Sequence, residues 1–366
     1  MHKRLNTLIL ATCTLTWMMA STSHAQVGMR QIQSDDMPIT MVYPTATAAQ
    51  PFTQGVFTIQ VAHNAAPLAA STGQRSLIVL SHGTAGSALP DHGLAATLAR
   101  AGFVVAQPEH RGDNWQDFSR AGPESWKTRP QDVVDAIDAV AQDPVLAPLV
   151  NTQRVGVHGM SAGGVTGLAL AGAQWSMLNL IQHCAQHMDE DIGFCLNGLA
   201  QHPVQQIVRK SQFSLVRMLT EGNAPSSLTT RQGGLSTDAS PTTDPRPDHR
   251  IAAVSLLVPV AGIFSSESLG RIRIPMGLTT AGGDSVLLPL FHSGHVLAHC
   301  KTCTVLSAHP GAGHFDWLSP WPAKVAQTVA ATQMRGGLPH AAFTDAQRQS
   351  AFDHIADFFA KTLRTP

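Results

Sequence analysis

The chain has 366 residues, of which 43% are hydrophobic and 13% are charged, with 24 basic and 24 acidic side chains. This balance, without a run of basic residues, argues against a nucleic-acid-binding protein, and we expect no such partner. The length suits one large α/β domain carrying an insertion, or two modest domains.

Residues 1–25 have the pattern of an export signal. Lys3 and Arg4 precede a mostly apolar stretch from Leu5 to Ala20, and Ser23-His24-Ala25 is a small-x-small cleavage site. A membrane anchor is the alternative, but polar residues dilute the stretch, and a spanning helix needs roughly 20 apolar residues. We therefore expect a signal peptide, a mature chain of residues 26–366 that is periplasmic or secreted, and no stable membrane insertion after cleavage.

Strands and helices alternate in the next part of the chain. Short β-branched runs are typical of strands that are buried on both faces, and this alternation predicts parallel strands joined by right-handed crossovers. Thr128 and Gln131 form a capping-box pattern with Pro130 in the first turn, which predicts that one helix begins there. The expected strands are Pro38–Tyr43, Val56–Ala62 and the runs that begin at Ser76, Phe103 and Arg154, and the other expected helices are Leu94–Ala101 and Ser161–Ala173.

This rhythm stops at about residue 174 and resumes at about residue 250. The interval contains two cysteines, an apparent helix near Gln205–Leu219 and a stretch rich in Ser, Thr, Gly and Pro. We interpret residues 174–249 as an insertion in one domain, placed to cover the site as a cap. The chain then predicts strands that begin at Ile251, Ile274 and Cys303, and helices at Trp321–Gln333 and Thr344–Leu363.

Four of the five cysteines remain once Cys13 leaves with the signal: Cys184, Cys195, Cys300 and Cys303. An even number in an exported chain indicates disulfides, and of the three possible connectivities, proximity favours Cys184–Cys195 and Cys300–Cys303. The alternative is a zinc site, because His295 and His299 lie beside the second pair. An oxidising compartment argues against free thiolates, so we expect no metal.

The stretch Gly156–Gly164 contains the motif Gly-x-Ser-x-Gly, at Gly159, Ser161 and Gly163. A nucleophile elbow places its serine on a sharp turn between a strand and a helix, with small neighbours that avoid clashes. The motif has this context here, because a predicted strand precedes it and a small-residue helix follows it. A structural glycine turn is the alternative, and only downstream partners distinguish the two.

Those partners follow in order. Asp284 comes directly after one predicted strand, and His314 lies in a glycine-rich loop after the next. Carboxyl ends of parallel strands share one edge of the sheet, so these side chains should meet Ser161. His314 would take the proton of the serine hydroxyl, and Asp284 would orient the imidazole. Glu267, which follows the preceding strand, is the rival acid.

The remaining candidates concern the oxyanion and the substrate. Two backbone N–H groups must face the developing negative charge. The residue after the nucleophile, Ala162, should supply one, and Thr84, in the loop after the first buried strand, the other. Trp115 and Trp126 lie in the long loop after the strand from Phe103 and could line a substrate pocket or pack as anchors.

Four segments together resemble the α/β-hydrolase superfamily: "LIVLSHGTAGS", "GVHGMSAGG", "AGGDSVLLP" and "GAGHFDWL". Within it, the chain is similar to bacterial dienelactone-hydrolase-like and platelet-activating-factor-acetylhydrolase-like esterases, from about Met37 onward. The resemblance implies a mostly parallel sheet flanked by helices. Two departures leave the substrate open: dienelactone hydrolases use a cysteine nucleophile, and the acetylhydrolases place their acid one strand earlier, where only Glu267 stands.

We therefore expect an exported serine hydrolase that cleaves small carboxylic esters, with short acyl chains favoured, through an acyl-enzyme and without a metal or organic cofactor. One alternative keeps the triad but changes the substrate, as in a lipase, a cutinase-like polyester hydrolase or a peptidase. Another is a non-catalytic extracellular binding protein on a hydrolase scaffold. The sequence leaves the natural ester and the oligomeric state open.

Overall fold

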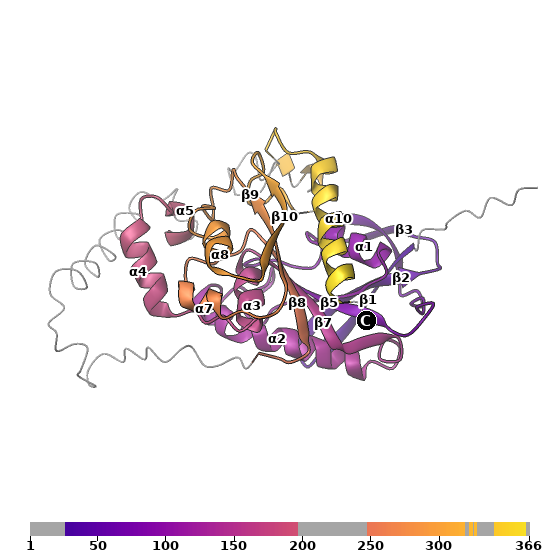
Figure 1. The fold of residues 1–366 in the computed structure, drawn as a ribbon. Helices are drawn as coiled ribbons and strands as arrows, with labels where there is room; N and C mark the ends of the chain where they lie inside the picture. Colours follow the sequence, from indigo (N-terminus) through magenta and orange to yellow (C-terminus); the bar gives the residue numbers. More distant parts are fainter. Residues whose placement is uncertain (1–25, 197–246, 319–321, 325, 328–339, 364–366) are drawn as a thin grey trace, which may run out of the picture.

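One central sheet organises the molecule (Figure 1). The structure, a computed structural model, describes residues 26–196, 247–318, 322–324, 326–327 and 340–363. The expected signal peptide, the expected helix near Gln205–Leu219, the polar stretch after it and most of the expected helix Trp321–Gln333 lie outside these residues. No helix within the described ranges is long and apolar enough to span a membrane.

The described residues form a ten-stranded sheet in the order β10-β9-β8-β7-β5-β6-β2-β1-β4-β3. The six strands from β10 to β6 pair in parallel, as the alternation of strands and helices predicts, and β2 joins β6 antiparallel. The strands are β1 Gln26–Ser34, β2 Met37–Thr45, β3 Gln50–Gln54, β4 Phe57–His63, β5 Arg75–Ser81, β6 Val104–Pro108, β7 Val150–Met160, β8 Ile251–Leu257, β9 Met276–Ala281 and β10 Cys303–His309.

Helices cover both faces of this sheet (Figure 1). Alternate residues of β5 point to opposite faces: Leu77 and Val79 pack in the core with α2 and α3, and Ile78 and Leu80 pack with α1 and α10. The helices are α1 His92–Arg100, α2 Pro123–Gln142, α3 Ala162–Leu170, α4 Met177–His187, α5 Ile192–Cys195, α7 Ser266–Gly270, α8 Ser293–His299 and α10 Asp345–Thr362.

Helix α2 begins six residues earlier than the capping-box pattern predicts, with Gly122 and not Thr128 as its N-cap. It starts at Pro123, after Gly122 at a φ of 95°, and Pro130 lies inside the helix. The Thr128 hydroxyl donates to the carbonyl of Ser125 (3.2 Å) instead of capping the helix. The first turn is stabilised by tertiary contacts, because Ser125 and the residue after it are buried there. The predicted start at Thr128 was therefore wrong.

Strands β1 and β3 are further elements that the sequence did not reveal. Polar and apolar residues mix in both, and β3 and β4 lie at the edge of the sheet, where many side chains are exposed. The central strands are uniformly buried, so their apolar runs are easier to recognise. The segments that carry Ser161, Asp284 and His314 follow the parallel strands β7, β9 and β10, at their carboxyl ends.

Candidate active site

Ser161 lies on a strained turn between β7 and α3. Its φ is 54° and its ψ is −116°, a conformation that costs a side chain about 1–3 kcal/mol. Three backbone hydrogen bonds hold it: the Ser161 N–H donates to Leu257 O (3.1 Å), and the Ser161 carbonyl accepts from Gly164 N and Val260 N (both 2.9 Å). The turn is therefore fixed by the neighbouring strand β8 and by the helix that it opens.

The two glycines of the motif are required by close packing. A Cβ on Gly159 would collide with the carbonyl group of Gly163, and a Cβ on Gly163 would collide with the carbonyl of Ser81 at the end of β5. Strand β7, helix α3 and strand β5 thus meet here with no room for a side chain. The context that distinguishes a nucleophile elbow from a loose glycine turn is present.

His314 joins Ser161 to Asp284. Its Nε2 lies 3.0 Å from Ser161 Oγ, and its Nδ1 lies 2.7 Å from Asp284 Oδ2. A carboxylate only accepts, so Nδ1 carries the proton and Nε2 is left to accept the serine hydroxyl. His314 and Asp284 are 4% and 3% exposed. The other carboxylate oxygen of Asp284 accepts from the amides of Val286 and Leu287, which fixes the acid in place.

The rival acid lies elsewhere. Glu267 is on α7, its side chain is 80% exposed, and it pairs with Arg271 (3.0 Å). The structure therefore brings Asp284 and not Glu267 to His314. A residue that sequence reasoning passed over supports the histidine loop instead: Asp316 accepts from Gly313 N (2.7 Å), directly before His314.

The two amides expected to bind an oxyanion flank the nucleophile. Ala162 is the first residue of α3, a position whose N–H has no partner within a helix. Thr84 follows Gly83, whose Cβ, if it had one, would lie 3.4 Å from the Cβ of Ser161. Within the described ranges, neither amide donates to another residue. Both are thus available to a ligand beside Ser161.

A cavity of about 920 Å³ opens above these groups. Ser161 and His314 lie in its wall, and both predicted pocket tryptophans line it. Trp115 is 56% exposed, whereas Trp126 is buried and packs edge-on against Trp175. Other apolar lining residues come from several segments and include Val56, Leu89, Leu180, Ile181, Phe194, Leu287 and Phe315.

The charged groups in this wall are acidic. Among the described lining residues there is no lysine or arginine, while the carboxyl groups of Asp91 and Glu109 are present. Burial raises the pKa of Asp91 to about 7. Burial also raises the pKa of Glu109, against a hydrogen bond from Trp115 that lowers it. An anionic substrate would therefore find no cationic side chain here.

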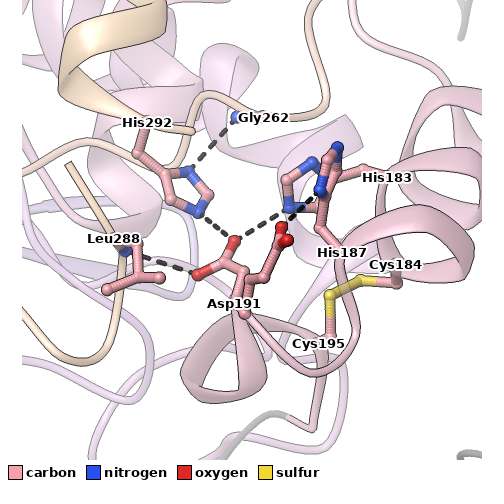
Figure 2. The surroundings of a disulfide bond; sticks show 9 residues. His183, Cys184, His187, Asp191, Cys195, Gly262, Leu288 and His292 are labelled. Carbon is pink, nitrogen blue, oxygen red and sulfur yellow. Dashed lines mark hydrogen bonds and ion pairs between the residues drawn. A yellow bond between two sulfur atoms is a disulfide. The ribbon is translucent and has the colours of Figure 1, made fainter. Parts of the chain in front are cut away.

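The first part of the insertion supplies one wall of the cavity. Helices α4 and α5 contribute Leu180, Ile181 and Phe194, and a disulfide joins Cys184 to Cys195 between them (Figure 2). Gly193 packs directly against the acid loop, where a Cβ would collide with the carbonyl of Ser285. Helices α4 and α5, which belong to the segment predicted to be a cap, thus form part of the cavity wall, and residues 197–246 of that segment lie outside the described ranges.

A buried carboxylate connects this cap to the loop that carries the acid (Figure 2). Asp191 Oδ2 accepts from His183 Nε2 (2.8 Å) on α4 and from His292 Nε2 (2.9 Å), and Oδ1 accepts from Leu288 N (3.3 Å). Burial raises the pKa of Asp191, but the two histidine hydrogen bonds outweigh it and bring the pKa to about 2. Asp191 is therefore a permanent anion between cap and acid loop.

Neither cysteine pair is free to bind a metal. Cys300 is bonded to Cys303, which removes the thiolates of the zinc alternative, and His295 Nε2 donates to the carbonyl of Phe264 (2.9 Å). His183, Asp191 and Cys195 lie within reach of a common ion, but the Cys195 sulfur is in its disulfide. The disulfide pairing is the one that proximity favours.

Both ring nitrogen atoms of His292 also take part in hydrogen bonds. Its Nδ1 accepts from the amides of Ala261 (3.0 Å) and Gly262 (3.2 Å), so the proton lies on Nε2, which donates to Asp191. A protonated nitrogen cannot ligate a metal. His183, Asp191 and His292 therefore form a hydrogen-bonded cluster that holds α4 and α5 against the loop of Asp284.

A second serine, histidine and aspartate lie in line behind the site, and sequence reasoning did not find them. His110 Nε2 is 2.8 Å from Ser81 Oγ, and His110 Nδ1 is 3.0 Å from Asp132 Oδ2. All three are buried, and none lines the cavity. They join the end of β5 to α2 and the loop after β6, and they have no access to substrate.

The chain is similar to a known protein family over part of its length and to solved structures in its fold. A model of the prolyl oligopeptidase family matches residues 92–178, a segment that includes Ser161 but neither Asp284 nor His314. A solved structure, the ferulic acid esterase from Streptomyces cinnamoneus, is similar over 94% of this chain and 92% of its own, with a TM-score of 0.54 and 17% sequence identity. No curated protein sequence matches the chain. Such distant likeness concerns the fold, so activity is argued from the site.

Proposed function

We propose that this chain, which has the α/β-hydrolase fold, is an exported serine esterase that cleaves carboxylic esters through an acyl-enzyme. The observation that carries the proposal is the position of His314, in hydrogen-bonding distance of both Ser161 Oγ and Asp284 in the wall of a largely apolar cavity. The two disulfides, which are typical of proteins in oxidising compartments, support export.

The residues would act in two half-reactions. Ser161 Oγ attacks the ester carbonyl carbon as its proton passes to His314 Nε2, and the amides of Thr84 and Ala162 bind the oxyanion. The bond to the leaving alcohol then breaks, and His314 returns the proton to that oxygen. Water repeats the sequence on the acyl-enzyme, which releases the carboxylic acid and restores Ser161.

The cavity favours neutral esters over acidic ones. Its volume of about 920 Å³ is at the upper end of the roughly 300–1,000 Å³ typical of ligand pockets. It therefore holds groups larger than the short acyl chains that we expect from the sequence. The described lining contains the carboxyl groups of Asp91 and Glu109 and no lysine or arginine that could pair with a substrate carboxylate, which argues against acidic esters.

A second candidate keeps the chemistry and takes bulky aromatic esters. Trp115, Trp126, Phe194 and Phe315 all line the cavity and offer flat apolar surfaces to a ring. The ferulic acid esterase with a similar fold is a further reason to test such esters.

The test compares the wild-type protein with Ser161→Ala on nitrophenyl esters of acetate, butyrate and a cinnamate. Wild type should hydrolyse at least one of them and react with a fluorophosphonate at Ser161, located by mass spectrometry. Ser161→Ala should lose both reactions, with activity falling by about 10⁴-fold or more, while it unfolds at the same temperature.

The control is Ser119→Ala at an exposed serine, which should keep full activity and labelling. Unchanged hydrolysis by Ser161→Ala, or a label at another serine, would contradict the proposal. A folded wild-type protein that neither hydrolyses esters nor takes the label would favour a binding protein.

A further inference from the structure

Arg129 is completely buried, and its guanidinium reaches the loop after β5. It lies on α2, is 0% exposed, and forms a two-pronged ion pair with Asp113 Oδ2, from Nε (3.1 Å) and Nη2 (2.8 Å). Its other hydrogen bonds go to backbone carbonyls: Nη1 donates to His82 O (2.5 Å), and Nη2 to Gly83 O (3.2 Å) and Asp113 O (3.3 Å). Two of its five hydrogen bonds therefore hold the loop that carries Thr84, and the other three hold Asp113.

Asp113 holds the same loop from its other end. Its Oδ1 accepts from the amide of Ala85 (2.8 Å), and Ser125 Oγ donates to Oδ2 (2.6 Å). Ala85 has a φ of 53°, which is unfavourable for a residue with a Cβ. The Asp113 carboxylate thus stabilises the strained backbone at Ala85, while Arg129 fixes the carbonyls of His82 and Gly83.

These contacts, together with the planarity of the peptide group, determine the direction of the Thr84 N–H. In a trans peptide the C=O and N–H point to opposite sides. The Gly83 carbonyl points inward, to Arg129 and to His82 Nδ1 (2.7 Å), so the N–H of Thr84 in the same peptide points away from them. Gly83 lies against Ser161 and Thr84 lines the cavity, so the outward side is the side of the site.

We infer that Arg129 and Asp113 are a positioning pair that aims the Thr84 amide at the oxyanion. This inference rests on the proposed esterase function. A buried ion pair is a weak source of stability, because desolvation of both charges offsets their attraction. Here the pair fixes three consecutive peptide groups beside the nucleophile, and neither side chain lines the cavity. The pair acts through the loop and does not contact substrate.

The experiment compares Arg129→Lys and Asp113→Asn with Arg75→Lys. Arg75 is the matched control, because it also donates to three carbonyls, those of Leu68, Ala69 and Gly102 (2.7–2.9 Å), but at the opposite end of β5. Competent sites are counted by end-point fluorophosphonate labelling, so misfolded protein does not enter kcat. The other readouts are KM and the affinity for a trifluoromethyl ketone, which forms an oxyanion on Ser161, against the matching methyl ketone.

Arg129→Lys should lower kcat per labelled site by about 10- to 100-fold, a fraction of the loss of a whole oxyanion donor, with KM within about threefold. Trifluoromethyl ketone affinity should fall in parallel with kcat, and methyl ketone affinity should hold. Arg75→Lys should lower only the unfolding temperature. Equal kcat per labelled site in Arg129→Lys, Arg75→Lys and wild type would overturn the inference.

Asp113→Asn keeps the oxygen that accepts from Ala85 and nearly the same shape, so it serves if Arg129→Lys does not fold. It should move kcat and trifluoromethyl ketone affinity in the same direction, and unchanged values would equally overturn the inference. Failure of the proposed function looks different: wild type itself would show no labelling or hydrolysis, whatever the state of Arg129.

Discussion

Asp284 and Glu267 show how far single residues can be assigned from sequence. Both follow parallel strands, so either could face His314 by position in the chain. What separates them is the local path: the amides of Val286 and Leu287 turn Asp284 inward, whereas α7 carries Glu267 to the surface beside Arg271. That difference depends on loop geometry, which has no compositional signal here.

Replacement of these two acids should give opposite results. Asp284→Asn keeps the shape of the side chain but removes the carboxylate oxygen that accepts from His314 Nδ1–H. The imidazole is then no longer held in its active tautomer, so kcat for a nitrophenyl ester should fall by about 10³- to 10⁴-fold. Glu267→Gln should stay within about twofold, since an exposed ion pair contributes little. Steady-state kinetics on both purified variants measures this. A large loss in Glu267→Gln alone would reverse the assignment.

The residues that sequence reasoning missed are those that act through distant partners. Arg129 meets His82 across 47 positions, and His110 meets Ser81 across 29. The Arg129 contact forms only when α2 packs on the sheet, and the His110 contact forms only when β5 pairs with β6. The positions of Ser161, Asp284 and His314 were easier to predict, since each follows a strand that the sequence predicts.

At the scale of elements, prediction worked best where an apolar run marks the element, and this includes β10, whose residues are half-buried or exposed. Strands β5 to β10 and helix α10 were anticipated, and Thr344 with Gln347 forms a real capping box at the start of α10. The same pattern at Thr128 lies inside α2, because the tertiary contacts of the preceding turn extend that helix. A capping pattern therefore marks the start of a helix only where the residues before it are not themselves helical.

The hydrogen bonds from His183 and His292 to Asp191 lead to a prediction about this carboxylate. Asp191→Asn removes the charge that two histidines share, so it should lower the free energy of unfolding by about 1–3 kcal/mol. Because the cap lines the cavity, KM for a bulky ester should rise more than kcat falls. Urea unfolding and steady-state kinetics measure the two effects.

Glu190→Gln is the matched control, since Glu190 neighbours Asp191 and also pairs with a histidine, His187 (2.7 Å), but is exposed. It should change stability by less than about 0.5 kcal/mol and leave KM unchanged. If both variants behave alike, the buried anchor does not hold the cap.

The whole molecule joins a predictable core to a less predictable site wall. The α/β-hydrolase fold was expected from the alternation of strands and helices and from motifs that resemble the superfamily, and it is confirmed. The cavity is shaped by the hairpin of β3 and β4, by the cap and by the loops after β5 and β9, which meet only in the folded state. The size of the cavity therefore depends on segments far apart in the sequence, whereas the proposed catalytic residues follow short motifs at strand ends.

Buried histidines make the stability of the whole molecule sensitive to acid. Burial lowers the pKa of His82, His110 and His292, and it lowers that of His158 to about 3. The unfolded chain binds protons at these histidines below about pH 6.5, whereas the native state does not until the folded pKa is reached. The free energy of unfolding is therefore undiminished by these histidines above about pH 6.5, and it decreases as the pH falls toward their pKa values in the folded state.

His158 offers a direct measurement of this linkage. Its Nε2 is buried without a hydrogen-bond partner among the described residues, and Nδ1 contacts Ser255 Oγ (3.2 Å). Between pH 7.5 and 4.5 it should cost the native state roughly 2–3 kcal/mol. His158→Asn should therefore lose less stability than wild type over this range, measured by urea unfolding at both pH values. The control His249→Asn, at a histidine that is 89% exposed, should follow wild type. Parallel pH profiles for His158→Asn and wild type would show that the acid sensitivity originates elsewhere.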